Sequence, residues 1–175
     1  MPVAISKRSG LSYQPGIGPH TESDTVTLAL EAVLDPMPPT RREVPYPSVA
    51  RSRCDVVIDE RPGWAIEFKM LRLMGDNGKP NDNMLMHILS PYPVHRSAVT
   101  DCPKLLVSGF DHRKAIIVFG YDYDTLVMDP AIDAFEALAG RHARLIAAAS
   151  SAFDDLVHPV HRRGRVFGWQ VTANE

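Results

Sequence analysis

The chain has 175 residues and a mass of 19.4 kDa, which is the usual size of one domain. Its 45% hydrophobic and 23% charged residues are typical of a globular protein and exclude a chain that is disordered throughout. A net charge of −2 and a pI near 6.4 exclude a protein that coats nucleic acid through bulk positive charge. Short apolar runs, no secretion signal and only two cysteines predict a cytoplasmic protein with no membrane partner.

The first half of the chain predicts an arm, a helix and three strands. Residues 1–20 have no periodicity and are expected to form a flexible arm, which leaves 21–175 as a single domain. An apolar stripe at helical spacing predicts a helix over 23–34, closed by three prolines. Prolines limit 41–47 to an edge strand or an extended segment, whereas the apolar runs 55–59 and 64–70 across a short turn predict a hairpin.

The second half alternates helices with strands. It predicts a loop at 75–83, a short helix at 84–89, a helix at 95–108 and a buried strand at 114–121. A further helix is expected to start at Asp129–Pro130 and to continue through Leu145 and Ile146, with a break near Gly140. The last strand is expected at 165–172. The whole order predicts an α/β fold with a central mixed β-sheet flanked by helices.

Three polar residues on the predicted hairpin point to phosphoryl chemistry. Glu67 and Lys69 lie on one face of their strand because side chains alternate. Asp55 begins the neighbouring strand and comes within reach of Glu67 if the register allows. Two carboxylates on adjacent strands can hold Mg²⁺. A lysine beside the metal can orient or deprotonate a water and stabilise the charge that grows on phosphorus.

This pattern resembles the PD-(D/E)XK nuclease superfamily, which has the restriction-endonuclease-like fold, over roughly 22–121. The resemblance implies that Asp55, Glu67 and the backbone carbonyl of Phe68 ligate the metal and that Lys69 assists the nucleophile. It also implies Mg²⁺ as the cofactor, with Mn²⁺ as a substitute. The motif occurs here as Asp55 followed by Glu67-Phe68-Lys69, with Cys54 in the place of the proline that names it.

Two choices of site residue stay open at this stage. Asp59 is a rival of Asp55, but it lies nearer the turn and is expected to be exposed at the hairpin end. The resemblance also implies a catalytic acidic residue on the first helix, for which Glu31 and Glu22 are the candidates. Glu31 is slightly preferred because it lies nearer the helix end that leads to the sheet.

Two local basic patches are candidate nucleic-acid contacts. One is Arg41, Arg42, Arg51 and Arg53, and the other lies in the acid-free tail, where Arg162, Arg163 and Arg165 are predicted to contact phosphate. His158 and His161 accompany that tail. Lys104 is a further candidate phosphate contact, although an ordinary surface ion pair with Asp101 is the preferred interpretation.

The first hypothesis is therefore a metal-dependent nuclease that acts on nucleic acid, with DNA preferred over RNA. It is expected to work as a homodimer or with a partner subunit that supplies target choice. A binding or assembly module with the same fold but no catalysis, part of a nucleic-acid-processing or defence complex, is the alternative. A small-molecule hydrolase that uses the same carboxylates is a third class.

Overall fold

The computed structural model describes residues 20–33, 38–81 and 83–174. The predicted flexible arm therefore lies outside the described residues, apart from His20. Within the described ranges, no helix is both long and apolar enough to cross a lipid bilayer. The elements are α1 (Glu22–Val33), β1 (Thr40–Pro45), β2 (Arg53–Ile58), β3 (Trp64–Leu71), α2 (Asn83–Leu89), the 3₁₀-helix η1 (Pro93–His95), α3 (Ala98–Leu106), β4 (Arg113–Tyr121), α4 (Asp129–Ala139), β5 (Arg144–Phe153) and β6 (Gly164–Thr172).

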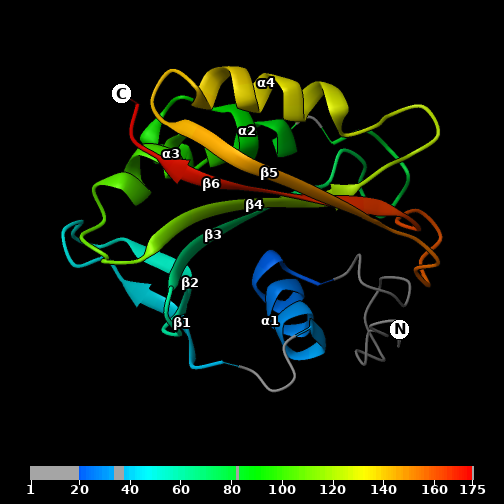
Figure 1. Cartoon of the computed structure of the whole chain (residues 1–175). Helices are drawn as coiled ribbons and strands as arrows, with labels where there is room; N and C mark the ends of the chain where they lie inside the picture. The colour runs from blue at the N-terminus through cyan, green and yellow to red at the C-terminus, as the bar shows by residue number, and fades with distance from the viewer. Residues whose placement is uncertain (1–19, 34–37, 82, 175) are drawn as a thin grey trace.

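One mixed six-stranded sheet, in the order β1-β2-β3-β4-β6-β5, organises the chain. Helices α2, α3 and α4 lie on one face of it, and α1 lies on the other (Figure 1). β2 and β3 form the predicted antiparallel hairpin, and β3 runs parallel to β4 after a crossover through α2 and α3. The predicted α/β class with a central mixed sheet flanked by helices is confirmed.

The core lies between the sheet and the three helices on its covered face. It is built from strand residues such as Val57 and Ile116 and from helix residues such as Leu105 and Phe135, all of them fully buried. This burial holds α3 against β3 and β4. The side chains of α3 are therefore presented to the middle of β3, where Glu67 and Lys69 lie.

Two predicted helices differ from the structure. The helix expected to run through Leu145 and Ile146 was wrong, because α4 ends at Ala139 and these residues belong to β5. β5 is an edge strand of mostly exposed alanines and serines, so it lacks the apolar alternation that marks a strand in the sequence. The helix expected over 95–108 is shorter: η1 precedes it, and Ser97 caps α3 by accepting a hydrogen bond from the Thr100 N–H.

Candidate active site

The site forms where β2 and β3 separate. The two strands pair from Ile58–Trp64 to Val56–Ile66, after which β2 continues beside β1 and β3 continues beside β4. Carboxylates then take the place of a neighbouring strand. The Phe68 N–H donates to Asp55 Oδ2 at 2.7 Å, and the Met70 N–H donates to Glu22 Oε2 at 2.5 Å. One carboxyl group from β2 and one from α1 therefore lie along the open edge of β3.

Glu67 lies beside them on the face covered by α3. Its side chain is 2% exposed, and Oε1 accepts hydrogen bonds from the Tyr46 hydroxyl and from Lys104 Nζ, the latter at 3.0 Å. Burial, followed by the nearby carboxylates of Asp101 and Asp55, raises the pKa of Glu67 to about 8. Ionisation of Glu67 beside these carboxylates is therefore unfavourable unless a further cation binds.

Lys69 is held in its protonated form. Its Nζ donates a hydrogen bond to the Phe68 carbonyl at 3.0 Å and forms an ion pair with Asp101 Oδ2 at 2.7 Å. Burial opposes the charge, but the carboxyl groups around it, with Asp101 the strongest and Glu22 next, outweigh burial and raise the pKa of Lys69. Asp101 Oδ1 binds Lys104 Nζ at 2.6 Å. Asp101 thus forms ion pairs with two ammonium groups at once.

Of the four carboxyl groups that the described residues place at the site, one has both oxygens paired and three have one oxygen without a hydrogen bond. Both oxygens of Asp101 are occupied by lysines. Among the described residues, the second oxygens of Glu22, Asp55 and Glu67 accept no hydrogen bond. Four carboxyl groups face two ammonium groups here, so full ionisation leaves two negative charges without a partner. Oxygen donors with this charge deficit suit a hard divalent cation such as Mg²⁺.

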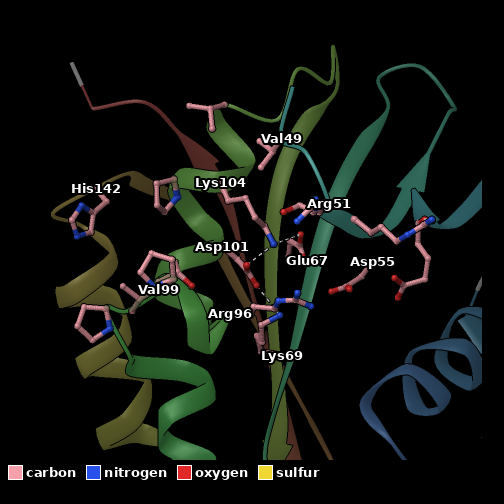
Figure 2. A pocket seen from close by; sticks show the side chains of 18 residues that line it. Val49, Arg51, Asp55, Glu67, Lys69, Arg96, Val99, Asp101, Lys104 and His142 are labelled. Carbon is pink, nitrogen blue, oxygen red and sulfur yellow. Dashed lines mark hydrogen bonds and ion pairs between the residues drawn. The ribbon is translucent and has the colours of Figure 1, made fainter. Parts of the chain in front are cut away.

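A cavity of about 690 Å³ opens over this group, bounded by the β1–β2 connection on one side and by η1 and α3 on the other. Figure 2 shows Glu67, Lys69, Asp101 and Lys104 joined by ion pairs, with Asp55 beside them. The cavity is large enough for a ligand of small-molecule size.

The structure brings Asp55, Glu67, Lys69 and the Phe68 carbonyl together, as the sequence predicted. The preference for Glu31 is corrected, because Glu31 is exposed while Glu22 reaches β3. The first turn of α1, not its last, packs against the strand. Asp59 is bound at the hairpin end by Arg41 and His112, away from this group.

Sequence reasoning missed two members of the group. Tyr46 follows β1 and fixes Glu67, but an isolated tyrosine gives no motif. Asp101 was assigned to a surface ion pair with Lys104, yet it is 1% exposed. Its spacing from Ala98 and Leu105 places it on the apolar face of α3, a signal that marks a buried carboxylate. The predicted phosphate contact Lys104 lies in the cavity, where Glu67 and Asp101 pair with its charge.

The basic tail does not join the cavity. Arg165 is gripped by Asp122 and Asp129, each of which accepts two hydrogen bonds from it. Arg163 pairs with Asp124, and Arg162 is exposed. Two of the three predicted phosphate contacts therefore have their charge matched within the chain.

A second cluster, formed by Asp76, His158 and His161, has ligand atoms within 4.8 Å of one another. His161 Nε2 lies 2.8 Å from Asp76 Oδ1, and its Nδ1 lies 2.8 Å from the Tyr123 hydroxyl. His158 Nδ1 accepts the N–H groups of Val160 and His161, so the proton of the neutral ring resides on Nε2. That tautomer offers no lone pair from Nε2 to a metal. Among the described residues, His158 Nε2 has no hydrogen-bond partner, whereas both ring nitrogens of His161 have one. His158 and His161 are too buried to contact an external phosphate.

No protein-family model, curated protein or solved structure matches this chain. The assignment of a function therefore depends on the geometry of the site.

Proposed function

We propose that the protein is a metal-dependent nuclease that hydrolyses phosphodiester bonds, with DNA preferred over RNA as its substrate. The observation that supports this best is that Asp55 and Glu67, each with one free oxygen, line an open cavity together with the ammonium group of Lys69. Asp55, Glu67 and the Phe68 carbonyl would hold Mg²⁺, or Mn²⁺ in its place, and Glu22 would complete the acidic set. Bound there, the cation supplies Lewis-acid polarisation of the phosphoryl group.

Each neighbouring side chain has a distinct task in this proposal. Lys69, kept protonated by Asp101, stabilises the negative charge that develops on the phosphoryl oxygens and orients the attacking water. Its raised pKa favours this electrostatic role over that of a general base. Tyr46 and Lys104 hold Glu67 through Oε1, which leaves its second oxygen for the cation. Asp101 is a positioning residue because lysines occupy both of its oxygens.

The order of elements supports the same proposal. A helix, a three-stranded meander, a helical crossover and a parallel strand surround the motif, as the resemblance to PD-(D/E)XK nucleases implies. A homodimer or a partner subunit would supply the second active centre or the choice of target.

The test is cleavage of plasmid, linear and single-stranded DNA, and of RNA, in Mg²⁺, Mn²⁺ and chelator. Lys69→Ala should reduce cleavage by a factor on the order of 10²–10³ while metal binding persists, because an ammonium group stabilises the transition state but ligates nothing. Lys79→Ala, at an exposed lysine outside the cavity, is the matched control. Equal cleavage by Lys69→Ala and the parent would contradict the mechanism.

A nuclease-like binding module remains the second candidate, for one specific reason. Asp55 and Glu22 each also accept a hydrogen bond from a backbone N–H group of β3. This structural role would be needed in an inactive protein as well. A parent protein that binds nucleic acid but does not cleave it in either metal would favour this candidate.

A further inference from the structure

Two arginines at the cavity have no partner among the residues that the structure describes. Arg51 lies in the β1–β2 connection, and Arg96 lies between η1 and α3. Both line the cavity and both are exposed. Among the described residues, neither guanidinium forms a hydrogen bond, an ion pair or a ring contact. Their charge is therefore available to a ligand.

The other basic residues nearby are already engaged. Lys69 and Lys104 pair with Asp101, and Arg53 donates to the Glu43 carbonyl at 2.6 Å. In the tail, Arg165 is held between two aspartates. In Figure 2, Arg51 lies above Glu67 and Arg96 lies below it. The two free charges thus flank the acidic group from different elements.

The backbone at both arginines is unusual. Arg51 has φ of 60° and Arg96 has φ of 48°, the left-handed region that favours glycine. Arg96 occupies the C-cap of η1, a position at which glycine is the common choice. Both arginines therefore hold a conformation that costs energy for a residue other than glycine, as do three further described residues.

From these observations we propose that Arg51 and Arg96 clamp the phosphates on either side of the scissile bond, so that the ligand of the cavity is a nucleic-acid strand. This inference rests on the proposed function, since the acidic group between the arginines is its reaction centre. A strand presents phosphates at regular spacing, and each would take one guanidinium through charge-assisted hydrogen bonds. In this proposal Arg51 and Arg96, and not the arginines of the tail, make the main electrostatic contact with the nucleic acid.

The experiment measures binding of a labelled oligonucleotide in Ca²⁺, without turnover, at several salt concentrations. Arg51→Gln with Arg96→Gln should weaken binding about tenfold or more and reduce the slope of log affinity against log salt by about 1.4–1.8, because each lost phosphate contact lowers it by about 0.7–0.9. Arg162→Gln with Arg163→Gln, the matched control in the tail, should change the slope little. A mononucleotide as competitor distinguishes a strand from a lone phosphate, since only the strand should engage both arginines.

Arg51→Gly and Arg96→Gly keep the test independent of folding. Glycine relaxes the backbone at positive φ, so the thermal midpoint should stay or rise while binding falls. Unchanged affinity and salt slope in these variants would overturn the clamp, even if the parent cleaves. Lost binding in the variants of a parent that never cleaves would instead support the clamp and count against the nuclease.

Discussion

Glu22 and Glu31 lie at opposite ends of α1, and only Glu22 reaches β3 beside the candidate site. Glu22 Oε2 accepts the Met70 N–H, and burial is the main cause that raises the pKa of its carboxyl group. Glu31 is exposed to solvent. An isosteric amide at position 22 keeps the hydrogen bond but removes the negative charge.

Glu22→Gln should therefore raise the Mg²⁺ concentration needed for half-maximal cleavage, by roughly tenfold, because one anionic oxygen donor is lost. Stability should stay near that of the parent. Glu31→Gln is the control and should leave the Mg²⁺ titration unchanged. If both variants shift the titration equally, Glu22 is not part of the metal site.

At this scale, the sequence predicts what one strand determines by itself. Alternation places Glu67 and Lys69 on one face, and the hairpin turn brings Asp55 opposite. Asp101 lies on α3 and Tyr46 lies after β1, so their approach to Glu67 and Lys69 depends on how α3 and the β1–β2 connection are placed relative to β3. Spacing in the sequence does not report how separate elements pack, so the contacts of Asp101 and Tyr46 with the motif could not be predicted.

At the scale of secondary structure, the candidate site forms because β2 and β3 separate. It leaves two N–H groups of β3 without a strand partner, and side chains satisfy them. Asp55 consequently has two roles, as a cap for the Phe68 N–H and as a proposed metal ligand. The two roles can be separated because asparagine retains an acceptor oxygen while it lacks the charge.

Asp55→Asn should abolish cleavage but keep most of the stability of the parent. Asp55→Ala should abolish cleavage and also lower the free energy of unfolding by a further ~1 kcal/mol, the usual cost of leaving one backbone donor unsatisfied. Denaturant unfolding of both variants measures the difference. Equal stability of the two would mean that water serves the Phe68 N–H and that Asp55 is no structural cap.

The hairpin, the buried β4 and the order of the first elements could all be predicted, because apolar strands and a short turn mark them. β5 could not, since an exposed edge strand rich in alanine has the composition of a helix surface. Only its pairing with β6 defines it.

For the molecule as a whole, buried titratable groups make stability depend on pH. The folded-state pKa of Glu67 is raised to about 8, above the value of 4.5 expected when unfolded. The folded state therefore retains this proton while the unfolded state loses it. Stability from this group is complete below pH 4.5 and is lost as the pH rises through about 8. The raised pKa of Glu22 acts in the same direction.

His161 acts in the opposite direction, at lower pH. Burial is the main cause that lowers its pKa from 6.5 to about 4, so its contribution is present above pH 6.5 and is lost as the pH falls through about 4. Between 4.5 and 6.5 the histidine and the carboxyl groups oppose each other. Above pH 6.5, only Glu67 and Glu22 of these three groups still make stability depend on pH.

In chelator, the free energy of unfolding should therefore fall between pH 6.5 and pH 8, with a slope of at most about 1.4 kcal/mol per pH unit for one proton. Glu67→Gln should flatten this slope, because the amide has no proton to lose. Mg²⁺ should flatten it as well, since a cation that binds the ionised carboxyl groups stabilises the folded state increasingly as the pH rises. Urea unfolding at several pH values, with and without Mg²⁺, measures both effects. A slope that neither Glu67→Gln nor Mg²⁺ changes would place the titrating group outside the acidic cluster and remove the charge deficit as support for a metal site.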